Sequence, residues 1–328
     1  MGSKFHKMDI NFITGNCSYL KYYLPLIIEF NKRGISSNIL LIKSKRYSDP
    51  YLNIKDIKLL SSEYHFNIDN ISNIKSNAVN FQIEGSGCKN IKNGVKISLT
   101  SLTDFQVLYD KYIDNVNYVI FPSKYFAEYY GKISNKNLYL GSPKYDTVFD
   151  IVKIRQKYDI KCNKNVLILF PRNRDVNILE LTKIYNCVHK LGYNIIVKTR
   201  GKDRTNKLLR GDKYFEDFSW FPHTTMELML VCDFIINFDS TSIKECVMLN
   251  VPIINFRIKP FVRPMEFLYN YSYCKNLRIQ SSEKEIEVAI HEISNRTYLE
   301  EFNLSRKKYL FEKEGVAKKI VDFTIGLK

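Results

Sequence analysis

Three consecutive hydroxyl side chains follow an apolar run that ends at Phe238. Ser240, Thr241 and Ser242 are predicted to form a turn between a buried strand and a helix. Such a turn suits a phosphate, because the first N–H groups of a helix are unpaired and the hydroxyls add donors. Glu245, further into the helix, could accept hydrogen bonds from a ribose. The alternative is that Ser240 or Thr241 only caps the helix and Glu245 completes a capping box.

Basic side chains follow two other predicted strands of the same half of the chain. These residues are Arg172 and Arg174 after one strand, and Lys198 and Arg200 at the end of the next. Arginine forks suit phosphate oxygens, although each cluster alone could be a solvated basic loop. His223 precedes a helix and could contact a base or phosphate, or serve only as a cap or surface residue. Three loops that leave the same edge of a parallel sheet favour one nucleotide site.

A carboxylate stands on a glycine-rich loop in the first half of the chain. Glu84 follows an apolar run and is succeeded by Gly85, Ser86 and Lys89. Glycines let a ligand approach the backbone closely, and a carboxylate there could act as a general base on a hydroxyl. Gly15, which also ends an apolar run, is a further candidate for substrate binding. The alternative is a turn that carries one solvated glutamate.

Several motifs are absent from the sequence. It contains no GxxxxGK[ST], no GxGxxG after the first strand, no HExxH and no Asp-x-Asp pair, and its five histidines and seven cysteines are dispersed. We therefore expect no metal and no cofactor. Nucleotide binding would depend on helix ends, hydroxyls and basic side chains.

Composition favours an ordinary folded protein with an anionic partner. The chain has 328 residues, of which 45% are hydrophobic and 26% charged, and its formal net charge is +16. These values exclude a disordered or collagen-like chain and predict attraction to polyanions. Scattered cysteines and the lack of a long apolar run predict a cytoplasmic protein, and the positive charge is compatible with peripheral contact with the inner face of a membrane. No nucleic-acid-binding motif is evident, so nucleic acid is not an expected partner.

Alternating apolar runs and helical patterns predict an α/β protein. Strands are expected at 9–14, 37–42, 64–68, 78–83, 95–99, 118–121, 138–140, 166–170, 194–198, 234–238 and 252–256. Helices are expected at 18–33, 123–131, 178–191, 226–231, 241–249 and within 283–328. A charged segment at 149–164 is the predicted linker. We expect two doubly wound, Rossmann-like domains, 1–150 and 151–328, facing a central cleft.

In order, these segments resemble the CDP-glycerol glycerophosphotransferase family of teichoic-acid and capsule enzymes, which have the GT-B fold. The similar segments lie between residues 78 and 325 and are 84–89, 141–146, 171–174, 238–242, 251–254 and 314–317. The resemblance implies a GT-B transferase with an acceptor domain followed by a nucleotide-donor domain. Two departures fall at the reacting centre: Glu84 stands where that family has histidine, and Lys198-Thr199-Arg200-Gly201 where it has Lys-x-His-Pro.

The departures favour glycosyl transfer with a carboxylate base over polyol-phosphate transfer. We expect a metal-independent, inverting transferase, which moves a sugar from a nucleotide-diphosphate donor to a hydroxyl of a surface glycan or lipid-linked anionic acceptor. Three alternatives remain open. They are a CDP-glycerol or CDP-ribitol polyol-phosphate transferase, a UDP-N-acetylglucosamine 2-epimerase-like enzyme, and a non-catalytic polyanion-binding protein.

Overall fold

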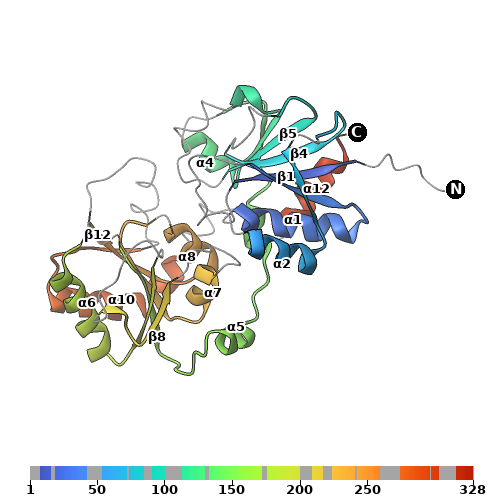
Figure 1. Cartoon of the computed structure of the whole chain (residues 1–328). Coiled ribbons are helices and arrows are strands. Elements are labelled where there is room, and N and C mark those ends of the chain that lie inside the picture. The colour runs from blue at the N-terminus through green and yellow to red at the C-terminus, as the bar shows by residue number, and fades with distance from the viewer. Residues whose placement is uncertain are drawn as a thin grey trace. The chain divides into compact units, whose positions relative to one another are not determined.

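The computed structural model divides the chain into two compact units, each built on one parallel sheet (Figure 1). The first unit consists of Met1–Thr147 together with Leu310–Lys328, and the second of Val148–Tyr309. The structure describes residues 8–15, 19–42, 54–71, 74–84, 91–100, 113–129, 133–171, 176–199, 209–216, 224–240, 242–258, 274–295, 297–302 and 315–327. The predicted α/β class and the pair of doubly wound sheets are confirmed.

The first unit contains a seven-stranded sheet in the order β3-β2-β1-β4-β5-β6-β7. Its strands are β1 (Ile10–Thr14), β2 (Ser37–Leu41), β3 (Asn67–Asn70), β4 (Val79–Ile83), β5 (Val95–Leu99), β6 (Tyr118–Ile120) and β7 (Asn137–Leu138). The chain winds from β1 to β3 in one direction and then returns to place β4 on the other side of β1. Ligands of open α/β sheets bind beyond the carboxyl ends of the strands at such a switch point.

The helices of the first unit bury aromatic side chains against this sheet. They are α1 (Leu20–Lys32), α2 (Ile54–Tyr64), α4 (Lys124–Tyr129) and α12 (Val316–Ile325), with the 3-10 turns η5 (Ile113–Asn115) and η6 (Pro143–Asp146). The rings of Phe12 and Phe81 stack at 5.1 Å between centroids, and the ring of Phe30 meets both edge-on. Tyr23 of α1 is fully buried and donates its hydroxyl hydrogen bond to the Ile13 carbonyl at 2.8 Å. These contacts fix α1 on one face of β1 and β4.

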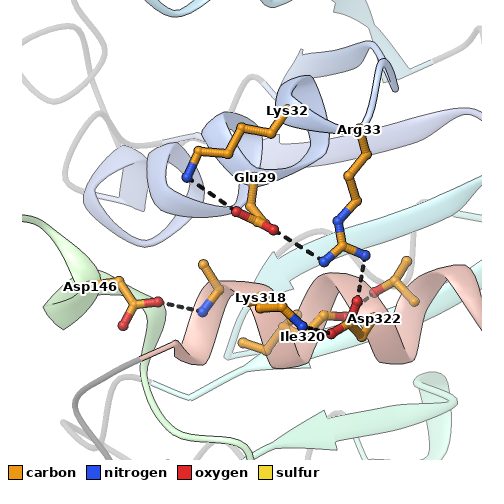
Figure 2. Close-up of polar contacts among 9 residues, drawn as sticks. Glu29, Lys32, Arg33, Asp146, Lys318, Ile320 and Asp322 are labelled. Carbon is orange, nitrogen blue, oxygen red and sulfur yellow. Dashed lines mark hydrogen bonds and ion pairs between the residues drawn. The ribbon is translucent and has the colours of Figure 1, made fainter.

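The C-terminal helix α12 packs on α1 and η6 and so belongs to the first unit. Figure 2 shows Arg33, which directly follows α1, between Glu29 and Asp322. The guanidinium lies 3.1 Å from the Glu29 carboxylate and 2.5 Å from that of Asp322. Asp146 of η6 accepts a hydrogen bond from the Ala317 amide at the start of α12. It thereby caps this helix, whose own N-cap residue is Gly315 and has no side chain. The sequence analysis placed this helix in the second domain, whereas its contacts with α1 and η6 place it in the first unit.

The second unit contains a six-stranded sheet in the order β10-β9-β8-β11-β12-β13, again with all pairs parallel. Its strands are β8 (Asn165–Leu169), β9 (Asn194–Thr199), β10 (Lys213–Glu216), β11 (Phe234–Asn237), β12 (Ile253–Arg257) and β13 (Lys275–Arg278). Its helices are α5 (Ile151–Lys157), α6 (Ile178–Lys190), α7 (Thr224–Leu230), α8 (Ile243–Leu249) and α10 (Glu283–Ile293). The helices α6 and α10 pack together, as do α7 and α8 (Figure 1). The switch point of this sheet lies between β8 and β11.

Most predicted elements have nearly the observed bounds, since both faces of the central strands are buried and their sequences are continuous apolar runs. Among the described α-helices and strands, α2, β10 and β13 were missed. The strand expected at 64–68 begins too early, because Tyr64 still belongs to α2 and β3 starts at Asn67. The segment predicted as a linker, 149–164, lies within the second unit, where its helix α5 packs on α7.

Candidate functional site

The turn that follows β11 lies at the switch point of the second sheet. It contains Asp239, which has a positive φ of 47°, followed by Ser240 and Ser242. Continuing the β8–β11 register places the turn beside the carboxyl end of β8, where Pro171 is also found. The fold thus brings the hydroxyl-rich turn predicted from the sequence to the edge at which parallel sheets bind ligands.

The serine hydroxyls of this turn are not used to cap α8. Ser242 is the N-cap residue, but its side chain makes no capping hydrogen bond. Its oxygen accepts a hydrogen bond from the Ser240 hydroxyl at 3.3 Å, and the Ser242 amide approaches Ser240 Oγ at 3.4 Å. A hydroxyl that accepts in this way can still donate its own proton to a ligand. Helix α8 has only seven residues, so its dipole is small. Binding of a phosphate at this turn would depend more on the hydroxyls and backbone amides than on the helix dipole.

Buried charged side chains accompany this edge of the second sheet. Lys198 near the end of β9 is 5% exposed, and Glu245 in the first turn of α8 is 8% exposed. Lys244, which the sequence analysis did not single out, is also buried, and all three residues interact within the protein. Charged residues are seldom buried in this way without partners. Lys198 and Glu245 are therefore buried charged groups at the edge of the sheet where a ligand is expected.

Glu84 lies at the equivalent position of the first sheet. It directly follows β4, has a positive φ of 50° and donates its amide hydrogen bond to the Leu99 carbonyl at 2.9 Å. Gly15 directly follows β1 and is buried. Since β1 and β4 pair in parallel, both residues lie at the switch-point edge of this sheet. A left-handed conformation at a non-glycine residue is uncommon and is found disproportionately at functional positions.

Eight of the predicted site residues lie outside the described residues. They are Gly85, Ser86, Lys89, Arg172, Arg174, Arg200, His223 and Thr241. Their roles stay predictions. The described part of the chain does include elements that flank these segments: β4, β8 and β9 precede three of them, and α7 follows His223.

Sequence reasoning did not identify the polar residues beneath the turn after β11. Asn237, Asp239 and Asn255 form hydrogen bonds to one another there. One asparagine in each of the neighbouring strands β11, β12 and β13 was the available signal, but only the strand register shows that they are aligned. Among the described residues, no group of histidine, cysteine, aspartate and glutamate could hold a metal ion. No helix in the described ranges is long and apolar enough to cross a membrane.

Comparisons with known proteins place the fold but not the family. No protein-family model matches the chain, and no curated protein matches it in sequence. A glycotransferase of kitacinnamycin is similar in structure, with 10% identity, a TM-score of 0.61 and 97% of both chains covered. UDP-GlcNAc 2-epimerase from Neisseria meningitidis, bound to UDP-GlcNAc, has 13% identity and a TM-score of 0.65, covering 97% of this chain and 100% of the other.

The wall teichoic acid polymerase TagF, in a structure soaked with CDPG, is a third similar protein. It has 13% identity and a TM-score of 0.64, with 98% of this chain and 88% of TagF covered. The alignments with all three span nearly the whole chain, including both parallel sheets. The protein therefore has the fold of GT-B glycosyltransferases and related epimerases, with two Rossmann-like domains.

Proposed function

We propose that the protein is a GT-B transferase, which moves a sugar from a nucleotide-diphosphate donor to a hydroxyl of a surface glycan or lipid-linked acceptor without a metal ion. The observation that carries the proposal is the placement of the predicted polar residues at both switch points. Ser240, Ser242 and Glu245 lie at the edge of the second sheet, and Glu84 at the edge of the first. Both sheets thus carry suitable chemistry where their topology favours ligand binding.

The second domain would bind the donor. Ser240 and Ser242 would donate hydrogen bonds to its phosphates, and Glu245 would accept hydrogen bonds from its ribose. Lys198, Arg172, Arg174 and Arg200 would neutralise charge that develops on the leaving diphosphate. His223 and Thr241 would contact the base or a phosphate of the donor. The structures of similar fold that hold UDP-GlcNAc or were soaked with CDPG support a nucleotide-linked donor.

The first domain would bind the acceptor. The Glu84 carboxylate would take the proton of the acceptor hydroxyl as that oxygen forms a bond to the anomeric carbon. The bond from this carbon to the diphosphate would break at the same time, which inverts the anomeric configuration. Gly15, Gly85, Ser86 and Lys89 would line the acceptor site. The formal charge of +16 supports an anionic acceptor, at the cytoplasmic face of a membrane.

Two alternatives keep the same fold and each has an observation in its favour. Similarity to TagF supports transfer of a polyol phosphate from a CDP-polyol. Similarity to UDP-GlcNAc 2-epimerases, together with the three-residue spacing of Ser242 and Glu245, supports an epimerase. Calorimetry with CMP, CDP, UMP, UDP and GDP, followed by assays of UDP-sugars and CDP-glycerol, separates these functions.

Replacement of the proposed base gives the sharpest test of the transfer reaction. Glu84→Gln keeps the size of the side chain but cannot accept the proton, so turnover should fall by roughly 10² to 10⁴. Nucleotide affinity should be unchanged, because the donor site is on the other sheet. Glu128→Gln, at an exposed position of α4, is the matched control and should retain full turnover. Undiminished turnover of the Glu84 variant would remove Glu84 from the mechanism.

A further inference from the structure

The turn after β11 is held by polar contacts from the neighbouring strand. One Asp239 oxygen, Oδ1, accepts a hydrogen bond from Asn255 Nδ2 at 3.0 Å, and the other, Oδ2, accepts one from the Ile258 amide at 2.8 Å. The Asp239 amide donates to Asn255 Oδ1 at 3.0 Å. Both carboxylate oxygens and the backbone of this residue are thus bound to β12 or the residue after it. This set of contacts, the Asp239–Asn255 clamp, offsets the cost of the left-handed backbone at Asp239.

Asn255 is fixed in turn by the strands on both sides. The register aligns Asn237 of β11, Asn255 of β12 and Asn276 of β13. Asn255 Oδ1 also accepts from Asn237 Nδ2 at 2.8 Å, and Asn255 Nδ2 also donates to Asn276 Oδ1 at 3.1 Å. Its amide therefore makes two bonds through each polar atom, which is its full capacity. Because Asn255 is fully buried, this ladder leaves its side chain a single orientation.

The same ladder reaches the proposed phosphate site through Asn237. Its Nδ2 donates to the Ser240 carbonyl at 3.2 Å, which fixes the backbone at the start of the turn. Asn237 is fully buried, and its Oδ1 has no hydrogen-bond partner among the described residues. A buried acceptor at a switch point is a place where the O–H or N–H of a ligand can bind. This second observation, independent of α8, also points to a ligand at this edge.

We propose that Asp239 and Asn255 are positioning residues, which hold the Ser240–Ser242 turn in the conformation that binds the phosphates of a nucleotide. The inference rests on the proposed donor site and deepens it. The clamp acts through the turn, and neither residue needs to touch the nucleotide. Because these hydrogen bonds are formed inside the protein, Asp239 and the Ser240 carbonyl are held before binding, and less conformational freedom is lost when a ligand binds.

Single and reciprocal substitutions test the clamp. Asp239→Asn replaces one of the two accepting oxygens by an NH₂ group, which then faces either the Asn255 NH₂ or the Ile258 amide. Asn255→Asp places a second carboxylate against that of Asp239. Each should weaken the affinity for the best-binding nucleoside diphosphate, measured by calorimetry, by about tenfold or more. The double substitution Asp239→Asn with Asn255→Asp exchanges the two groups. An aspartate at position 255 can accept hydrogen bonds from the new asparagine at 239 and, if the Asn276 amide flips, from Asn276 Nδ2. The hydrogen bonds of the clamp can thus be restored, and the double variant should recover most of the nucleotide affinity.

A buried asparagine ladder in the first sheet provides the matched control. Asn11 is 3% exposed, donates to Asn80 Oδ1 at 2.9 Å and accepts from Asn38 Nδ2 at 3.0 Å. It stands near the amino end of β1, away from the switch-point edge. Asn11→Asp should therefore lower thermal stability as Asn255→Asp does, while nucleotide affinity stays at the wild-type value. Equal losses of affinity in both variants would overturn the positioning role.

Hydrogen exchange of the ligand-free protein separates failure of the clamp from failure of the proposed donor site. In Asp239→Asn, exchange should accelerate at the Ile258 amide and remain unchanged in β1 and β4. If the wild-type protein binds no nucleotide, the proposed donor site fails, and this exchange pattern alone decides whether the clamp holds the turn. Unchanged exchange at Ile258, or unchanged nucleotide affinity in both single variants, would refute the inference.

Discussion

The side-chain amides of Asn80 and Gln82 are both buried on the same face of β4, but only that of Asn80 makes hydrogen bonds among the described residues. Asn80 accepts from Asn11 and donates to the carbonyls of Asn93 and Val95, and it is fully buried. Gln82, two residues further on, is also fully buried, but neither of its amide atoms has a partner among the described residues. An unsatisfied buried polar group lowers stability, whereas a satisfied one contributes to it. Similar substitutions at these positions should therefore have effects of opposite sign.

We expect Gln82→Met to raise the free energy of unfolding by about 1 kcal/mol, because an apolar side chain of similar length needs no hydrogen bond. Asn80→Leu should lower it by about 1 to 3 kcal/mol, since it leaves buried partners unsatisfied. Urea unfolding of both variants measures the two differences. A loss of stability at Gln82 as large as that at Asn80 would mean that the Gln82 amide is satisfied in solution.

Apolar central strands could be predicted from the sequence, whereas the polar edge strands β10 and β13 of the second sheet could not. Both faces of β8 and β11 are buried, so their apolar runs mark them directly. The edge strands β10 and β13 begin with lysine and end with a charged residue, and they resemble loops. The Ser240–Ser242 turn was predicted because three hydroxyls follow an apolar run. The Asp239–Asn255 clamp was not, because it joins residues far apart in sequence through the strand register.

The contact between α1 and α12 depends on charges that titrate in acid. The pKa of Asp322 is lowered by the hydrogen bonds from Lys318 and Arg33, with smaller contributions from their charges. An aspartate whose pKa is lowered in the folded state stabilises that state at neutral pH. This stabilisation disappears as the pH falls from about 4 through the lowered pKa, because the carboxylate is then protonated in both states.

Asp322→Asn should accordingly reduce the thermal stability of the protein at neutral pH, and the difference from wild type should vanish as the pH is lowered. Added NaCl should also reduce the difference, because these side chains are partly exposed. Thermal melts across a pH series measure both effects. Asp114→Asn, at an exposed position of the same unit, should show neither. A difference that is constant from neutral to acidic pH would rule out the ion pair as its source.

At the scale of the whole molecule, the first unit is completed by the last helix of the chain. Residues before Val148 and after Tyr309 fold together, and the second unit lies between them in sequence. Sequence patterns showed a helix near the C-terminus but not the unit to which it belongs, because an amphipathic pattern identifies a buried face and not its partner. Val316, Ile320 and Val321 of α12 are fully buried. Burial of three such side chains contributes several kcal/mol, a large share of the stability of one domain.

Removal of residues 310–328 should therefore unfold the first unit and leave the second folded. The chain has one tryptophan, Trp220, within the sequence of the second unit, so tryptophan fluorescence reports on that unit alone. In urea, the fluorescence transition of the shortened chain should match that of the full chain, while the helix and strand signal in circular dichroism should already be reduced in buffer.

Ile320→Ala in the full chain should lower the stability of the first unit by about 2 to 5 kcal/mol, without shifting the fluorescence transition. Loss of the Trp220 transition in the shortened chain would show that the two units do not fold independently.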